Sequence, residues 1–180
     1  MAIKIIYFVH GTTTDNEQHK SAGWNDVSLS EKGVKQTLAL KNEQCIKEVD
    51  LVITSDLKRA IDSAKNIFKQ NKGIIIKQDF RIRECNYGDL NGSDSSLIDY
   101  EKYITKPFPN GESLKDVEKR VKDLCDDIVK KYDGKTIAIV SHRAPQLALE
   151  VITKNISWEE AIQNDWRKNK AWQPGWIFKI

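Results

Sequence analysis

The hydrophobic residues of this chain gather in short apolar runs, which alternate with longer segments of helical period. Residues 3–9, 50–54, 74–77 and 136–140 are rich in β-branched and aromatic side chains, a composition typical of buried strands. Between such runs, segments such as 114–128 carry apolar residues three and four positions apart, which indicates a helix with one buried face. Strands that alternate with helices predict an α/β fold with a mostly parallel sheet.

Polar and turn-forming residues set the expected limits of the helices. Ser30, Ser55 or Asp56, and Ser113 are suitable N-caps for three of them, since their side-chain oxygens can accept from the first free N–H groups. The predicted helices cover about 31–44, 57–69, 93–103, 114–132, 145–154 and 157–168, and a last strand covers 176–180.

Two histidines stand at the ends of predicted strands. His10 ends the first apolar run, and His142 follows the run 136–140. Ligands of open α/β sheets bind at the carboxyl ends of the strands, so we expect both histidines in one site. Arg59 falls in the first turn of a predicted helix, where free N–H groups and the helix dipole favour an anion.

Composition narrows the class of protein. The chain of 180 residues is 39% hydrophobic and 31% charged, as expected of one soluble domain spanning 1–180. Its 29 basic and 26 acidic residues are mixed along the sequence, which argues against nucleic acid as a partner. No apolar run reaches membrane length, so we expect no membrane partner and a cytoplasmic location. The oligomeric state is left open.

The three cysteines are Cys45, Cys85 and Cys125. Their number and wide spacing match no zinc or redox motif. With no carboxylate cluster either, the sequence predicts no metal and no cofactor.

Several motifs resemble those of one known family, the histidine phosphatase superfamily, in the branch of phosphoglycerate mutases and broad phosphomonoesterases. The matching residues, in the order of the family, are His10-Gly11, Thr13, Asn16, 23–33, Glu84, Tyr87-Gly88, Gly92, 110–113 and Ser141-His142.

The resemblance implies a three-layer α/β/α sandwich and a metal-independent phosphatase that hydrolyses small phosphomonoesters. In this interpretation His10 accepts the phosphoryl group, and Glu84 protonates the leaving group. The phosphate oxygens would be held by His142 together with Arg59, Asn16, Thr13 and Gly11. A short substrate-loop insertion is expected at about 85–113.

The chain departs from the family pattern at two places. The family has Arg-His-Gly where this chain has Val9-His10-Gly11, and the arginine is either replaced or deleted. Arg143 stands where the family has glycine after the second histidine, and it could supply the lost donor. Three functions therefore stay open: an active phosphatase, a phosphoglycerate mutase-type phosphotransferase, and a weak or inactive member that binds phosphorylated ligands.

Overall fold

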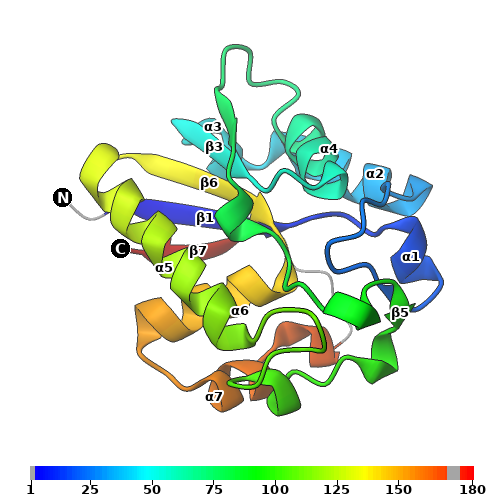
Figure 1. The fold of residues 1–180 in the computed structure, drawn as a ribbon. Coiled ribbons are helices and arrows are strands. Elements are labelled where there is room, and N and C mark those ends of the chain that lie inside the picture. Colours follow the sequence, from blue (N-terminus) through cyan, green and yellow to red (C-terminus); the bar gives the residue numbers. More distant parts are fainter. Residues whose placement is uncertain (1–2, 170–174) are drawn as a thin grey trace.

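A five-stranded sheet forms the centre of the molecule (Figure 1). The structure is a computed structural model that describes residues 3–169 and 175–180. Its strand order is β4-β3-β6-β1-β7, in which β7 is antiparallel to β1 and the other neighbours are parallel. The strands are β1 (Lys4–Val9), β3 (Leu51–Thr54), β4 (Ile76–Gln78), β6 (Thr136–Ser141) and β7 (Trp176–Lys179).

Helices cover both faces of this sheet. Figure 1 shows α5 (Leu114–Lys131) and α6 (Arg143–Lys154) on one face, with α2 (Glu31–Ala39) and α4 (Lys58–Ile67) on the other. Strand β1 contributes to both cores, since Ile5 and Tyr7 pack with α5 and α6, and Ile6 and Phe8 pack with α4 and with the segment that follows α2. This alternation follows from the two-residue period of a strand. The prediction of an α/β fold with a mostly parallel sheet is confirmed.

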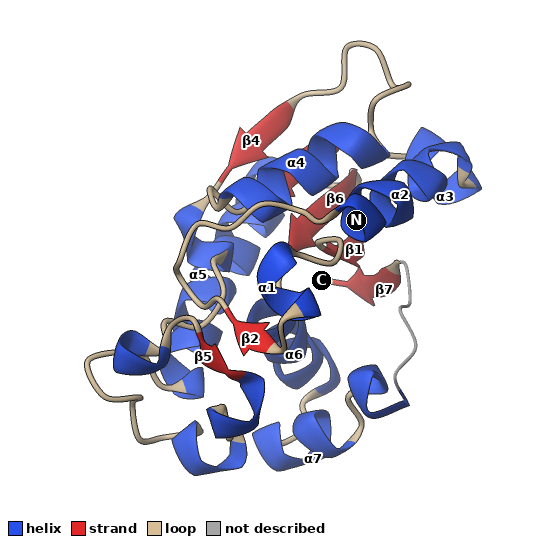
Figure 2. Ribbon diagram, turned by 90° about the vertical axis from the view of Figure 1, so that its right-hand side faces the viewer, coloured by secondary structure: helices blue, strands red, loops and turns tan. Residues whose placement is uncertain are grey.

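Smaller elements surround the sheet. They are α1 (Thr14–Glu17), β2 (Lys20–Ser21), α3 (Gln44–Lys47), β5 (Ser93–Asp94) and α7 (Trp158–Gln163). Strands β2 and β5 pair with each other in a separate two-stranded sheet, and Figure 2 shows this small sheet beside α1.

Three predicted helices differ from the observed ones. Helix α2 ends at Ala39 rather than near residue 44, because Glu43 adopts an extended conformation between a 3₁₀ turn and α3. Residues 93–103 are not one helix, because Ser93 and Asp94 pair with β2 and only 3₁₀ turns follow. The prediction for 157–168 is also too long, since α7 ends at Gln163.

The start of α4 is corrected as well. Its N-cap is Leu57, not Ser55 or Asp56. Both polar side chains are engaged elsewhere, because Ser55 Oγ bonds to His142 Nε2 and Asp56 pairs with Arg83. Ser30 and Ser113 cap α2 and α5 as predicted.

The parallel register places the two predicted histidines side by side. Val9 of β1 is paired with Ser141 of β6, so the residues that follow, His10 and His142, leave the sheet at the same edge. Within residues 3–169 and 175–180, no helix has the length and apolar character needed to cross a membrane.

Candidate active site

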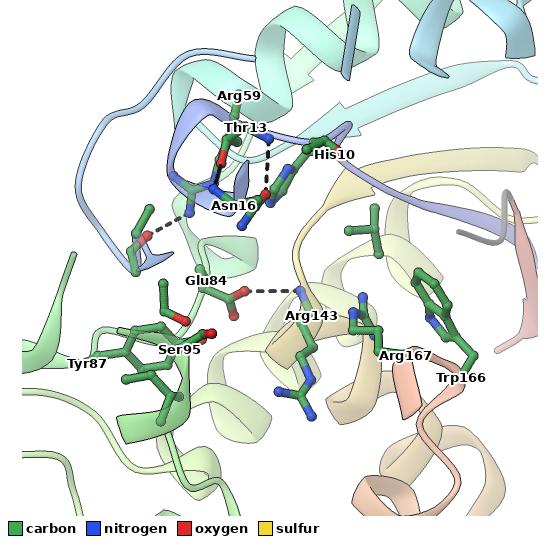
Figure 3. Close-up of a pocket in the computed structure, with 16 residues that line it drawn as sticks. His10, Thr13, Asn16, Arg59, Glu84, Tyr87, Ser95, Arg143, Trp166 and Arg167 are labelled. Atoms are coloured by element: carbon green, nitrogen blue, oxygen red, sulfur yellow. Dashed lines mark hydrogen bonds between the residues drawn. The ribbon is translucent and has the colours of Figure 1, made fainter. Parts of the chain in front are cut away.

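A cavity of about 340 Å³ opens at this edge of the sheet. Residues from both ends of the chain line it (Figure 3). Of the predicted site residues, the cavity lining includes His10, Thr13, Asn16, Arg59, Glu84 and Arg143. The apolar side chain of Val9 also lines it, directly before His10. A volume of this size suits a small molecule rather than a polymer.

His10 is held as a neutral imidazole. Its Nδ1 lies 2.7 Å from the carbonyl oxygen of Gly11, and since a carbonyl only accepts, Nδ1 carries the hydrogen and Nε2 keeps its lone pair. Burial, with the charges of Arg59 and Arg167, lowers the pKa of His10 to about 3. A histidine in this state has the free electron pair that a nucleophile requires.

Arg59 lies almost fully buried in the first turn of α4, as the sequence predicts. Its guanidinium is fixed by two backbone carbonyls, those of Gly23 at 2.6 Å and Asn25 at 3.0 Å. Figure 3 shows it beside Asn16 and Thr13. These hydrogen bonds use two of the five N–H groups of arginine, so the side chain keeps donors for an anion.

Thr13 and Asn16 form the capping box of α1. The Asn16 carboxamide oxygen accepts from the Thr13 N–H at 3.1 Å, and Thr13 Oγ1 accepts from the Asn16 N–H at 3.1 Å. This exchange fixes the orientation of Asn16, since its oxygen is engaged and its NH₂ group remains the donor available to the cavity.

Gly11 has a different place from the one expected. It is not part of the cavity lining, and its N–H donates to Ser63 Oγ at 3.1 Å. A Cβ at this position would lie 2.5 Å from the carbonyl oxygen of Gly33. Gly11 therefore allows a close approach of backbone to backbone, and its predicted contact with phosphate is not supported by this geometry.

His142 is wholly buried, and its ring centroid lies 5.1 Å from that of His10. Its Nε2 is 2.6 Å from Ser55 Oγ. Ser55 Oγ accepts from the Leu57 N–H, and among the described residues its hydroxyl hydrogen has no acceptor other than Nε2. Ser55 therefore donates to Nε2, and Nδ1 carries the ring hydrogen of His142. Burial, with Arg59 and His10 nearby, lowers the pKa of His142 well below its usual value. The second histidine is thus a neutral N–H donor beside the first.

Glu84 is fixed by backbone amides. Its Oε1 accepts from Cys85 at 2.9 Å and from Ala144 at 3.0 Å, while Oε2 accepts from Arg143 at 3.2 Å. Two of these amides belong to the first turn of α6. Glu84 as a residue is only 7% exposed, and its carboxyl group faces the cavity between the two histidine loops (Figure 3).

Arg143 lines the cavity, but its guanidinium does not approach His10. Its Nε donates to Asp165 at 2.7 Å, and the guanidinium carbon lies 4.3 Å from the centre of the Tyr100 ring. Figure 3 shows the guanidinium pointing away from His10. The expected replacement of a missing donor by Arg143 is not supported by this placement.

Several residues of the site were missed from the sequence. Trp166 and Arg167 line the cavity from the carboxyl-terminal part of the chain. Tyr7 supports His142, since its hydroxyl donates to the His142 carbonyl at 2.7 Å. Trp24 and Arg120 donate to the carbonyl of Glu84. These contacts join residues that are far apart in the sequence, so no local motif predicts them.

The comparisons with known proteins agree with this geometry. The family model of the histidine phosphatase superfamily (branch 1) matches residues 6–172. His10, Arg59 and Glu84 line one cavity at the edge of the sheet, and His142 lies beside His10. The chain belongs to the histidine phosphatase superfamily.

Named relatives include phosphatases and mutases. Phosphoserine phosphatase 1 from Hydrogenobacter thermophilus is 30% identical over 157 residues, which cover 82% of this chain and 74% of that protein. A 2,3-bisphosphoglycerate-dependent phosphoglycerate mutase from Bifidobacterium longum is 26% identical over 200 residues, with 89% of this chain and 80% of that protein covered.

The solved structures show the same fold. YhfR from Bacillus stearothermophilus superposes with a TM-score of 0.78 at 26% identity, covering 88% of this chain and 83% of that chain. A mycobacterial glucosyl-3-phosphoglycerate phosphatase superposes with a TM-score of 0.77 at 24% identity, covering 88% and 83%. The three-layer arrangement of helices on both faces of a mostly parallel sheet is thus shared with these proteins.

Proposed function

We propose that this protein is a metal-independent phosphatase that hydrolyses small phosphomonoesters through a phosphohistidine on His10. The observation that carries the proposal is the state of His10, which is neutral and has its Nε2 lone pair free in the cavity. Arg59 and the Nδ1–H of His142 would hold the phosphoryl oxygens as negative charge develops. Asn16 would add a neutral donor from α1.

The reaction would run in two steps. In the first, His10 Nε2 attacks phosphorus, the ester P–O bond breaks, and Glu84 gives its proton to the departing alkoxide. In the second, Glu84 takes a proton from water, the resulting hydroxide attacks phosphorus, and the P–N bond breaks to release inorganic phosphate. The proton returns to Glu84, so the enzyme ends as it began.

The segment 85–113 is proposed to contact the leaving group. Tyr87, Ser95 and Ile98 line the cavity from this segment. They combine apolar surface with the Ser95 hydroxyl, since the Tyr87 hydroxyl is bonded to that of Tyr100. This composition suits a small polar alcohol rather than a large aromatic one. We expect the reaction to take place in the cytoplasm, where thiols such as the buried, unpaired Cys85 and Cys125 stay reduced.

The relatives suggest which substrates to test. Their names include phosphoserine and phosphoglycerate, so a phosphate-release screen would cover phosphoserine, glycerate phosphates, sugar phosphates and nucleotides, each with and without EDTA. We expect release of phosphate from one or more of these esters, unchanged by EDTA. An absence of hydrolysis across the set, or its loss in EDTA, would contradict the proposal.

A mutase would behave differently in the same screen. It passes the phosphoryl group from His10 to a second alcohol, so 2-phosphoglycerate and 3-phosphoglycerate would interconvert faster than phosphate is released. The Bifidobacterium relative is the observation that favours this second candidate. We expect release to water to dominate.

A further inference from the structure

Three buried side-chain nitrogens have no hydrogen-bond partner within the described part of the chain. They are His142 Nδ1, Trp166 Nε1 and Arg167 Nη2. An unpaired buried donor destabilises the folded protein, and a charged one does so more strongly, so such atoms are rare and call for an explanation. All three belong to residues around His10 or its cavity.

We propose that Arg167 and Trp166 bind the phosphoryl oxygens of the substrate from the carboxyl-terminal side of the cavity. The inference rests on the proposed function for the identity of the ligand, and it extends the site to the 3₁₀ helix Trp166–Asn169. The two residues would act as phosphate-binding residues in addition to Arg59.

The guanidinium of Arg167 is held in place from one side only. Its Nη1 donates to Asp165 Oδ1 at 2.9 Å and to Gln146 Oε1 at 3.1 Å. The guanidinium carbon lies 4.5 Å from the centre of the Trp166 ring. These contacts fix the plane of the group while Nη2 stays unpaired. Figure 3 shows this guanidinium and the Trp166 indole side by side on the cavity wall.

Arg167 lines the same cavity as His10. Its charge contributes to lowering the pKa of His10. Val9 offers only an apolar side chain to the cavity next to His10, so β1 supplies no cationic donor there. Arg167 brings one from the other end of the chain.

The arrangement of donors fits a tetrahedral oxyanion. Arg59 lies on the opposite side of the cavity from Arg167 (Figure 3), and an anion between them would face two guanidinium groups. An arginine N–H and an indole N–H next to each other can reach two different oxygens of one phosphoryl group. A ligand of this kind would satisfy the nitrogens that the protein leaves unpaired.

Asp165 decides which of two arginines faces the substrate. Its side chain has no exposed surface. One carboxylate oxygen accepts from Arg143 Nε and the other from Arg167 Nη1. The first bond holds Arg143 toward Tyr100, away from His10. The second engages Nη1 of Arg167, while its buried Nη2 stays unpaired. Asp165 therefore acts as a positioning residue.

The test is binding of inorganic phosphate by titration calorimetry, measured on the full chain. Arg167→Ala should weaken binding by about 10-fold to 100-fold, since a hydrogen bond to a charged group contributes about 1.5–3 kcal/mol. Trp166→Phe keeps the ring and removes only the N–H, and should weaken binding by about 3-fold to 10-fold. Lys168→Ala, an exposed cation in the same 3₁₀ helix, is the matched control and should bind as the wild type does.

A purely structural role for Arg167 predicts another result. Arg167→Ala would then lower the melting temperature but leave the affinity of the folded protein for phosphate unchanged, and Trp166→Phe would do nothing. Wild-type affinity in both variants, an equal loss in Lys168→Ala, or no binding of phosphate to the wild type would overturn the inference.

The design separates this inference from the proposed function. Phosphate binding that depends on Arg167, in a chain that hydrolyses no phosphomonoester, would support the inference and contradict the proposed function. Hydrolysis that depends on His10 but is unaffected by Arg167→Ala would do the reverse.

Discussion

Two walls of the cavity are built on different physical principles. The first wall, residues 9–16 with Arg59, is held by close backbone packing, since a Cβ on Gly33 would lie 2.0 Å from the Thr12 carbonyl oxygen. The second wall, residues 142–143 and 165–167, is held by charge, since buried Asp165 pairs with two arginines. Backbone packing therefore fixes the position of His10, the proposed nucleophile, on the first wall. Ion pairs with Asp165 fix the direction of the two guanidinium groups on the second.

Because of this difference, the two walls should respond differently to substitutions and to changes in pH or salt. Backbone packing does not depend on pH or salt. A buried carboxylate paired with two cations does, because changing one member leaves an uncompensated charge in the interior. Variants on the first wall should therefore act through His10 and its position, and variants on the second through the direction of the arginines.

The largest effect is expected at the first wall, from the nucleophile. His10→Ala should lower kcat/KM by roughly 10⁴-fold or more, because removal of a covalent nucleophile leaves only binding and charge stabilisation. Steady-state phosphate release measures the change. His19→Asn is the control, since His19 is exposed with a φ of 58° and asparagine tolerates that conformation. Activity of His10→Ala within tenfold of the control would contradict the assignment.

Glu84 lies between the two walls and comes second. Glu84→Gln should slow alkyl phosphates by about 10²-fold to 10⁴-fold, the usual contribution of general acid catalysis. Hydrolysis of p-nitrophenyl phosphate should fall much less, because its leaving group needs little protonation. Each rate is compared within the same folded variant, so a change in stability does not alter the ratio. Equal losses on both esters would mean that Glu84 has a structural role alone.

Asp165→Asn should break the second wall. Neutralising the carboxylate leaves two arginines without their counter-charge, and we expect a loss of about 3 kcal/mol in the free energy of unfolding. Asp126→Asn removes an exposed partner of Lys122 and should cost less than about 1 kcal/mol. Urea unfolding of both variants checks the comparison, and similar losses would contradict a second wall held by charge.

Gly33→Ala should strain the first wall. Helix propensity alone predicts a gain of up to about 1 kcal/mol from this change, but the new Cβ would meet backbone atoms of Thr12. We expect a net loss of about 1–3 kcal/mol together with lower activity as the His10 loop shifts. Lys35→Ala on the exposed side of α2 is the matched control. A stabilised Gly33→Ala variant would show that the close packing does not constrain the loop.

The smallest effect is a pH dependence of stability. The pKa of His10 falls from 6.5 to about 3 on folding, so between these values the unfolded chain binds a proton that the folded protein does not. Stability then rises with pH from about 3 to 6.5 and levels off above. The free energy of unfolding of the wild type should rise between pH 5.5 and pH 7.5. In His10→Asn this rise should be smaller by about 1 kcal/mol. An identical pH dependence in both proteins would contradict the neutral state of His10.

The sequence predicts the first wall better than the second for a physical reason. His10 and Arg59 are placed by local features, a strand end and the first turn of a helix, and both lie where the pattern puts them. The fold class follows from periodicity in the same way. Hydrophobic spacing also identified the buried face of α5, on which Leu114, Val117, Val121, Leu124 and Ile128 are all in the core.

The second wall depends on contacts that no local pattern contains. Arg143 was expected to face the substrate, but its direction is set by Asp165, which lies 22 positions away in the chain. Residues 157–168 were expected to form one helix. That prediction missed the end of α7 at Gln163 and the separate 3₁₀ helix that places Trp166 and Arg167 at the cavity.

The central claim is that His10 carries the phosphoryl group during turnover. The most direct measurement is rapid quenching of the wild-type protein with ³²P-labelled substrate, followed by denaturing separation and treatment with acid or alkali. We expect label on the wild-type protein that is lost in acid and stable in alkali, as is typical of a phosphohistidine, and no label on His10→Ala. Acid-labile, alkali-stable label persisting on His10→Ala, or wild-type turnover without any labelled protein, would contradict it.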